Sequence, residues 1–340
     1  MILMGVAFRT TAGPTIGLGH LRRCVTLAQA LQLHGIVCHF SIDHDPAALR
    51  FLREYGFDGI EERDKHDLIR TLEYLERWGA RALVVDSYAI EDGRLGQLKG
   101  PFVVVIDDLG GRPLPVDLIV NGSANAAELT YCTRPETQLL LGPEYVLLRE
   151  EFSREPQRTV RGRVERVLIS VGGTDRFQLT SRMVAWTHEA LGQVVTDVVV
   201  GPFFSQDAVQ ELEQLAENSQ GIVVLHRDPP YMRELMLACD LAVAGGGQTA
   251  YELAATGTPA VAIRLADNQT GNLKGLSGSG ALTWVGDASD RDLHGKAVVA
   301  LVELSVDPKH RREMGRTGRR LVDGRGAKRV AQAIMEACQN

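Results

Sequence analysis

The stretch Pro14-Thr15-Ile16-Gly17-Leu18-Gly19-His20-Leu21-Arg22-Arg23-Cys24 decides the fold of the first half of the chain. The apolar run Ile2–Phe8 precedes it and predicts a buried strand. Behind it, apolar residues recur at helical spacing: Leu21, Val25, Leu27, Ala28 and Leu31. Two glycines and a histidine therefore fall in the strand-to-helix turn of a first βα unit.

His20 is the candidate catalytic residue of this turn. Gly17 and Gly19 let the backbone come close to a ligand. The helix N-terminus offers unpaired N–H groups and a partial positive charge. That charge disfavours protonation, so we expect His20 to be neutral and able to accept a proton. From this motif alone, a histidine that merely caps the turn is an equally good interpretation.

Composition narrows the class of protein. A length of 340 residues predicts about two domains, and a net charge of −6 gives no reason to expect a nucleic-acid partner. The five cysteines form no C-x-x-C pair, which favours a reduced, cytoplasmic protein over a disulfide framework or a zinc site. No apolar run approaches transmembrane length, and Met1–Phe8 is too short and lacks the basic leader of a signal peptide.

Buried, non-alternating strands separated by helices predict parallel sheets covered on both faces. In the first half, the predicted strands are Ile36–Ile42, Ala82–Asp86, Phe102–Asp107, Leu118–Asn121 and Leu139–Leu141, with helices at Ala47–Tyr55 and Asp67–Arg77. In the second half, they are Val167–Val171, Val194–Val200, Ile222–Leu225, Leu241–Ala244, Ala260–Ile263 and Leu282–Val285. A helical, partly basic segment closes the chain, from about Pro308 to Cys338.

These patterns predict an α/β fold of two doubly wound, Rossmann-like domains that face one cleft. The first domain covers residues 1–150 and the second covers residues 164–340. An arginine-rich linker with Pro156 and Gly162 joins them at about 151–163, and the last helix is free to cross back. Ligands of such sheets bind beyond the carboxyl ends of the strands.

A second glycine-rich turn ends the strand after Asp240. Gly245-Gly246-Gly247 leads into a helix that starts at Gln248 and Thr249, which predicts an anion site built from backbone N–H groups. Glu252 lies one helical turn further, where it can accept hydrogen bonds from a ribose. Tight helix–sheet packing is the weaker alternative. Neither turn carries a G-x-G-x-x-G fingerprint with its distant acid or a G-K-[ST] loop, so a dehydrogenase or a kinase fits poorly.

The segment Ile16–Cys24 resembles the I-G-x-G-H-x-x-R-C signature of nucleotide-sugar hydrolases in pseudaminic acid biosynthesis, which related spore-coat polysaccharide biosynthesis proteins share. Further matches follow in order: Val85–Tyr88 (D-x-Y), Ile106–Asp108 (paired acids), Leu147–Phe152 (L-R-E-E-F), Ile169–Asp175 (G-G-T-D) and Asn268–Asn272 (N-Q-x-x-N). The resemblance covers nearly the whole chain. It implies the GT-B architecture, similar to the glycosyltransferase that makes lipid II.

The resemblance also implies an activity: hydrolysis of UDP-2,4-diacetamido-2,4,6-trideoxy-β-L-altropyranose, without a metal or other cofactor, in a pathway that supplies polysaccharide or flagellin glycosylation. His20 would be the general base on water. The implied substrate contacts are Arg9, Gly17, Gly19, Tyr88 and Asn125 in the first domain, and Gly173, Thr174, Met232, Gly246, Gly247, Gln248, Thr249, Glu252, Asn268 and Gln269 in the second. The UDP-sugar is the expected partner, with no nucleic acid and no membrane insertion, and the chain is expected to be a monomer or a weak dimer.

The chain departs from the family in two places. The R-x-D pattern of the first strand is Arg9-Thr10-Thr11 here, so an acid that could orient the sugar or the histidine is missing from it. The asparagine-rich segment survives only partly, as Asn121–Asn125. The exact sugar therefore stays open. A GT-B glycosyltransferase with a UDP-sugar donor and a non-catalytic nucleotide-sugar-binding protein are the alternative functions.

Three acidic segments have two interpretations each. Asp86 ends a strand and either faces the cleft or caps a turn. Asp107-Asp108 could indicate metal-dependent glycosyl transfer, but a pair that ends a buried strand is more typical of residues that face the cleft or cap a turn, and the family that the chain resembles needs no metal. Asp43-His44-Asp45 is more typical of an exposed turn than of a metal site, which needs ligands that converge in space.

Overall fold

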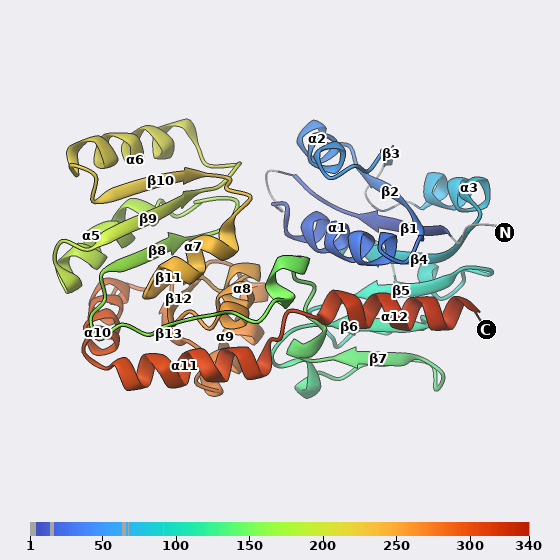
Figure 1. Ribbon diagram of the computed structural model, residues 1–340. Helices are drawn as coiled ribbons and strands as arrows, with labels where there is room; N and C mark the ends of the chain where they lie inside the picture. Colours follow the sequence, from blue (N-terminus) through green and yellow to red (C-terminus); the bar gives the residue numbers. More distant parts are fainter. Residues whose placement is uncertain (1–4, 14–16, 63–65, 67, 91, 340) are drawn as a thin grey trace. The chain divides into compact units, whose positions relative to one another are not determined.

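The computed structural model describes residues 5–13, 17–62, 66, 68–90 and 92–339 (Figure 1). The chain divides into two compact units, each with its own parallel sheet. The first unit comprises residues 1–150 and 325–340, and the second comprises residues 151–324. Residues 151–163, predicted as a linker, thus pack with the second unit, and the last helix packs with the first.

The first unit contains a seven-stranded sheet in the order β3-β2-β1-β4-β5-β6-β7, with every pair parallel. Its strands are β1 (Gly5–Thr10), β2 (Val37–Asp43), β3 (Gly59–Glu62), β4 (Ala80–Asp86), β5 (Phe102–Ile106), β6 (Leu118–Asn121) and β7 (Gln138–Leu141). Its α-helices are α1 (Gly19–Gln32), α2 (Pro46–Glu54), α3 (Ile69–Trp78), α4 (Asp92–Leu95) and α12 (Gly326–Gln339), and short 3-10 turns lie at Ala126–Glu128 and Pro143–Tyr145.

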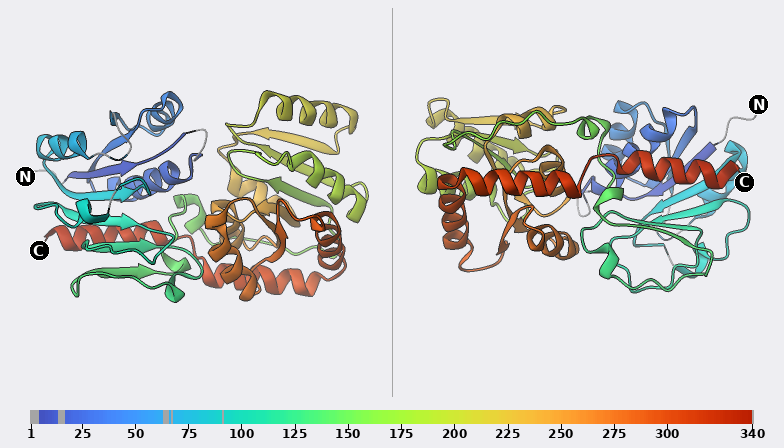
Figure 2. Two further views of the ribbon diagram at one scale, coloured as in Figure 1. Left: turned by 180° about the vertical axis from the view of Figure 1, so that it is seen from behind. Right: turned by 60° about the horizontal axis from the view of Figure 1, so that its bottom comes forward.

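Helices cover both faces of this sheet. On one face, α3 contributes Leu75 to a cluster with Ala7, Leu83 and Val105 of the strands. On the other, α1 contributes Leu21, Cys24 and Leu27, which are fully buried, and α12 packs beside α1. The two views in Figure 2 show the last helix lying along the first unit. Helices on both faces explain why the strands are apolar on both sides.

The second unit contains a six-stranded parallel sheet in the order β10-β9-β8-β11-β12-β13. Its strands are β8 (Arg166–Ser170), β9 (Val195–Val200), β10 (Val223–Arg227), β11 (Leu241–Gly245), β12 (Ala260–Arg264) and β13 (Thr283–Asp287). Its α-helices are α5 (Thr180–Leu191), α6 (Gln206–Asn218), α7 (Met232–Ala238), α8 (Gln248–Thr256), α9 (Thr270–Gly278), α10 (Leu293–Val306) and α11 (Pro308–Leu321), with 3-10 turns at Glu150–Ser153 and Asp267–Gln269.

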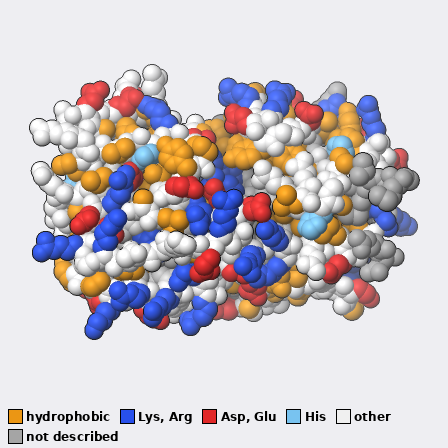
Figure 3. All heavy atoms as spheres, in the orientation of Figure 1, with side chains coloured by type: hydrophobic (Ala, Val, Ile, Leu, Met, Phe, Trp, Pro, Cys, Tyr) orange, Lys and Arg blue, Asp and Glu red, His pale blue; other side chains and the backbone are white. Residues whose placement is uncertain are grey.

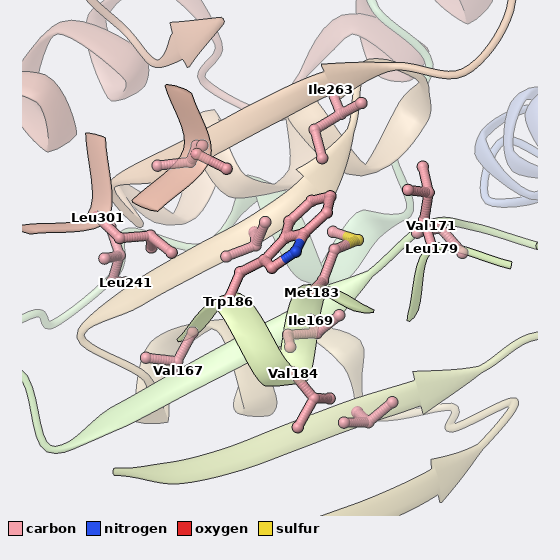
Figure 4. Packing of buried hydrophobic residues seen from close by; sticks show 14 of the residues in the cluster. Val167, Ile169, Val171, Leu179, Met183, Val184, Trp186, Leu241, Ile263 and Leu301 are labelled. Carbon is pink, nitrogen blue, oxygen red and sulfur yellow. The ribbon is translucent and has the colours of Figure 1, made fainter. Parts of the chain in front are cut away.

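Trp186 lies within the larger core of the second unit. Its indole packs near Met183 and Ile169, between α5 and the sheet (Figure 4). The side chain is 6% exposed. Burial of such an aromatic ring contributes strongly to stability, so Trp186 serves as a core residue of this unit.

The predicted strands of both halves are observed, with ends that differ by one or two residues; residues 2–4 of the first predicted strand lie outside the described residues. The structure adds β3, a strand that the sequence pattern missed. Gly59-Ile60-Glu61-Glu62 is short, half polar and at the edge of the sheet, so it lacks the apolar run of a central strand. The last segment is two helices, α11 and α12, because Val322–Arg325 interrupts it.

The return of the chain to the first unit depends on close backbone contacts. Gly324 has φ +72°, and a Cβ there would lie 2.2 Å from the carbonyl oxygen of Phe152. A Cβ at Gly326 would lie 2.2 Å from the carbonyl oxygen of Val146. Glycine is thus required where α12 begins. Among the described residues, no helix combines the length and apolarity needed to cross a bilayer.

Candidate functional site

In each sheet, the strand order changes direction at one strand, which is the topological switch point of the sheet. In the first unit, β1 has β2 on one side and β4 on the other. In the second unit, β8 lies in the same way between β9 and β11. Crevices at the carboxyl ends of such strand pairs are the usual ligand sites of open α/β sheets. The residues after β1, β4, β8 and β11 are therefore the first to inspect.

His20 and Asp86 meet at the switch point of the first unit. Nδ1 of His20 lies 2.6 Å from Oδ1 of Asp86, which is the last residue of β4 and fully buried. A carboxylate only accepts hydrogen bonds, so the contact with Asp86 places a proton on Nδ1, from which Arg23 Nη2 also lies 3.1 Å away. In the neutral ring with this tautomer, Nε2 is the acceptor. Within the described part of the chain, Nε2 has no hydrogen-bond partner, and the side chain is 11% exposed. In enzymes, a histidine that acts as a base is commonly oriented by a further group in this way.

Arg23 fixes the ionisation of Asp86. Its Nε and Nη2 donate to the two oxygens of Asp86, at 2.6 Å each. Burial alone would raise the pKa of Asp86, but the Arg23 guanidinium and His20 outweigh it and hold that pKa well below its usual range. Asp86 thus stays ionised and holds the His20 ring in one tautomer. From the sequence, Asp86 either faces the cleft or caps a turn. Because β4 pairs with β1, Asp86 lies beside His20, which places it in the candidate site.

Arg23 also extends the cluster to the next strand. Its Nη1 donates to Oδ2 of Asp108, after β5, at 2.6 Å. The Tyr88 hydroxyl donates to the same oxygen at 3.0 Å, and the Tyr88 ring packs edge-on against His20 with centroids 5.1 Å apart. Burial and the Asp108 charge raise the pKa of Tyr88, so it remains a phenol and a donor. Tyr88, a predicted sugar contact, therefore lies beside the candidate base.

The paired acids after β5 have separate roles. Asp107 is fully buried and accepts hydrogen bonds from the Gly110 N–H at 2.6 Å and from Arg112 Nε at 3.0 Å. It caps its own loop. Asp108 faces the histidine cluster instead. One sequence pair thus contains one structural acid and one site acid.

The acid missing from the first strand is replaced from two neighbouring strands. Asp86 orients the histidine from β4. Asp43 is the last residue of β2. It accepts hydrogen bonds from the Thr11 hydroxyl and, at 2.6 Å, from Nη2 of Arg9. Arg9 is fully buried, and its Nη1 donates to the carbonyl of Thr10 at 2.8 Å. The histidine thus has an acid beside it although the R-x-D pattern is absent, because Asp86 comes from another strand.

The three residues of the segment Asp43–Asp45 contact different parts of the first unit. Asp45 caps α2 through the N–H groups of Ala47 and Ala48, and His44 pairs with Glu61 at 2.9 Å. The described residues contain no group of three or more His, Cys, Asp or Glu that could hold a metal ion.

The remaining predicted residues of the first unit lie at the same sheet edge. Gly17 has φ +82°, which favours glycine, and a Cβ at Gly17 or at Gly19 would meet nothing within 4 Å. Asn125 precedes the 3-10 turn after β6, and its Oδ1 is buried without a hydrogen-bond partner among the described residues. Asn121, by contrast, is engaged by Tyr131 and the Ser123 N–H.

Backbone forms the corresponding edge of the second unit. Gly172 and Gly173 follow β8, and their carbonyls lie so close to Gly201 that a Cβ there would be 2.3 and 2.6 Å from them. Thr174 continues this loop, and Asp175 caps α5 by accepting from the N–H groups of Leu179 and Thr180. The G-G-T-D segment thus ends in a structural cap.

Gly245, Gly246 and Gly247 join β11 to α8 next to this loop. A Cβ at Gly246 would lie 2.5 Å from Leu273, so packing requires that glycine. Gly247 is the N-cap of α8 and has no side-chain cap, so the first N–H groups of the helix, from Gln248 and Thr249, lie at an uncapped N-terminus. Such a helix terminus favours an anion. Packing thus accounts for Gly246, whereas the anion site at Gly247 and the start of α8 stays a prediction.

The other predicted residues surround this terminus. Gln269 lies against Gly247, and its Oε1 accepts from the Leu265 N–H at 2.9 Å. Asn268 is exposed in the same turn, which Arg264 anchors through Asp267 and Thr270. Glu252 lies on α8, and Met232 begins α7 after β10. The second unit thus gathers its predicted residues at the ends of β8, β11 and β12, with Met232 after β10.

Solved structures share this fold over nearly the full length. MurG from Acinetobacter baumannii superposes with a TM-score of 0.68, at 15% identity, over 98% of this chain and 99% of that chain. The spinosyn rhamnosyltransferase SpnG in complex with thymidine diphosphate gives a TM-score of 0.68 at 16% identity, over 99% of this chain and 100% of that chain. The fold is that of the GT-B class, as predicted.

Three named relatives are similar to the chain in sequence, although no family model matches it. The Bacillus subtilis spore coat polysaccharide biosynthesis protein SpsG is 22% identical over 98% of both chains. The Campylobacter jejuni UDP-2,4-diacetamido-2,4,6-trideoxy-β-L-altropyranose hydrolase is 24% identical over 54% of this chain and 65% of its own. A Helicobacter pylori protein that joins the same hydrolase to a pseudaminic acid cytidylyltransferase is 23% identical over 75% of this chain and 43% of its own. The resemblance seen in the motifs is confirmed, at low identity.

Proposed function

We propose that this chain hydrolyses a UDP-linked deoxy-diacetamido sugar to the free sugar and UDP. The first unit holds the sugar and the catalytic base, and the second unit binds UDP. The names of the Campylobacter and Helicobacter relatives support the reaction. The observation that carries the proposal is the His20–Asp86 pair at the β1–β4 switch point, with Nε2 unpartnered among the described residues.

In the proposed step, His20 Nε2 removes a proton from water as the water oxygen attacks the anomeric carbon. The bond between that carbon and the bridging phosphate oxygen breaks, and its electron pair leaves with UDP. Asp86 stabilises the imidazolium that forms. This charge arrangement is favourable because Asp86 is ionised and fully buried, where it interacts strongly with a neighbouring cation.

The leaving group gains charge as the bond breaks. The N–H groups at the start of α8, including those of Gln248 and Thr249, are placed to stabilise the diphosphate. Gly173 and Thr174 of the loop after β8, and Gln269 beside Gly247, complete the proposed diphosphate contacts. Glu252 binds the ribose, and the backbone near Met232 contacts the base. Tyr88 and Asn125 contact the sugar.

The test is turnover in ¹⁸O-labelled water. Purified protein is incubated with UDP-2,4-diacetamido-2,4,6-trideoxy-β-L-altropyranose, and UDP and sugar are analysed by mass spectrometry. The proposal expects the label in the sugar and none in UDP. His20→Ala should lower kcat by about 100- to 10,000-fold. Near-normal turnover of His20→Ala, or label in UDP, contradicts the mechanism.

Transfer to an acceptor is the second candidate, because SpnG and other solved neighbours with this fold are named as glycosyltransferases. The same assay separates the two reactions. Release of UDP that depends strictly on an added acceptor favours a transferase, whereas binding of the UDP-sugar without any turnover favours a non-catalytic binding protein.

A further inference from the structure

Asp108 is the one carboxylate of the histidine cluster with an oxygen left over. Oδ2 accepts from Arg23 Nη1 at 2.6 Å and from the Tyr88 hydroxyl at 3.0 Å. Oδ1 has no hydrogen-bond partner within the described residues, and it is not among the buried unsatisfied atoms. The side chain is 18% exposed. One oxygen is therefore fixed, and the other is open to solvent.

The orientation of Asp108 is set before any ligand arrives. Arg23 is itself held by Asp86, and the Tyr88 ring is held against His20. Two donors on one oxygen restrict rotation of the carboxylate, so the position of Oδ1 is defined as well. A fixed acceptor loses less conformational entropy on binding than a mobile one.

We propose that Asp108 determines which sugars bind, because its Oδ1 accepts a hydrogen bond from a hydroxyl or amide N–H group of the sugar. This inference rests on the proposed function for the identity of the site. A carboxylate only accepts hydrogen bonds, so the group that it recognises must be a donor. A sugar that carries a carboxylate at that position is repelled. The ligand class is a UDP-sugar with an uncharged N–H or O–H donor, to which acetamido sugars belong.

The effect of Asp108 is measured by binding in a background without turnover. His20→Ala and His20→Ala/Asp108→Asn are titrated calorimetrically with UDP and with UDP-2,4-diacetamido-2,4,6-trideoxy-β-L-altropyranose. Asparagine keeps the size of the side chain but loses the charge. The proposal expects the double variant to bind the UDP-sugar about 10- to 100-fold more weakly, as for a lost hydrogen bond to a charged group, and UDP equally well.

Two further variants keep the result interpretable if Asp108→Asn disturbs the cluster. Asp108→Glu restores the charge and should recover part of the lost affinity. Asp107→Asn changes the neighbouring buried acid, which caps its own loop, so any loss there should be equal for UDP and the UDP-sugar. Equal losses for both ligands in Asp108→Asn, or no loss for either, overturn the inference.

Failure of the proposed function is a different result. If the wild-type chain releases no UDP in any assay, hydrolysis is wrong, but the binding comparison still decides the role of Asp108. If the wild-type chain turns over and Asp108→Asn discriminates nothing, hydrolysis stands and the inference on Asp108 falls.

Discussion

In the described part of each unit, a buried aspartate lies between a histidine and an arginine. In the first unit, His20, buried Asp86 and Arg23 form one trio. In the second, Asp197 is fully buried between His226, at 2.8 Å, and Arg166, at 2.5 and 2.8 Å. The difference lies in the free nitrogen. His226 uses Nε2 for Asp197, and its Nδ1 lies 3.4 Å from the Tyr231 hydroxyl.

Place in the sheet explains this difference. Asp86 ends β4 beside the turn after β1, at the edge where ligands bind, whereas Asp197 lies in the middle of β9. One trio therefore presents a proton acceptor and the other fastens neighbouring strands. At its own switch point, the second unit instead places the backbone of the loops that follow β8 and β11. A charged trio is evidence for catalysis only where its histidine keeps an unused nitrogen.

The test with the largest expected effect makes the same substitution at each of the two buried aspartates and compares the variants. Asp86→Asn should lower kcat by about 100- to 10,000-fold, since the histidine loses the group that fixes its tautomer, as in other His–Asp pairs. Asp197→Asn is the matched control: it loses stability but keeps kcat within a few-fold when assayed well below its melting temperature. Steady-state kinetics with UDP release decides. Equal kcat losses in both variants break the comparison.

The acid sensitivity of Asp86→Asn is a second test of the first trio. The folded-state pKa of Asp86 is lowered, so its ionised form stabilises the native state. That contribution is complete above the usual carboxyl pKa of about 3.9 and is lost as the pH falls through the lower folded value. Asp86→Asn should cost about 3–5 kcal/mol at pH 7, and the difference from wild type should shrink below about pH 4. Urea unfolding at pH 7, 5 and 3.5 measures it; a constant difference contradicts the assignment.

A smaller effect tests the backbone site. Gly246→Ala places a Cβ 2.5 Å from Leu273 and should cost about 1–3 kcal/mol in the free energy of unfolding. Gly247→Ala meets only Gln269, at 3.4 Å, and should cost less. Thermal unfolding compares them. If the two variants lose the same stability, packing does not distinguish the adjacent glycines.

The smallest expected effect concerns the nucleotide. Glu252→Gln removes a charge that the proposed function assigns to the ribose, so UDP should bind about 10-fold more weakly. Because the change lies in the second unit, kcat at saturating substrate should move little. Titration with UDP and with UDP-sugar gives both numbers. A large kcat loss with unchanged UDP affinity would place Glu252 in the chemistry instead.

Local sequence patterns predicted most of the fold but only half of the candidate site. His20 and the three glycines were found because each lies where the sequence pattern changes from a strand to the next helix. The partnership of His20 with Asp86 was not, because it depends on β4 lying beside β1, which is a long-range pairing. The separate roles of Asp107 and Asp108 depend on which carboxylate turns back toward Gly110, a conformational detail that no residue pattern encodes. The edge strand β3 was missed for want of an apolar run.

The sequence predicted a basic segment near the C-terminus but not the partners of its side chains. The exposed basic residues of α11 include Lys309, Arg312, Arg316 and Arg320. Figure 3 shows basic side chains interspersed with acidic ones on the face in view. Some of this charge is paired locally, as Arg319 is with Glu155 at 2.8 Å.

The route of α12 has a consequence for synthesis on the ribosome. The second unit is one continuous segment, 151–324, so it can finish folding while the chain is still being made. The first unit cannot, because the helix that covers α1 consists of residues near 330. The half of the protein translated first is therefore the half completed last, and until then its apolar α1 surface needs protection from other nascent chains.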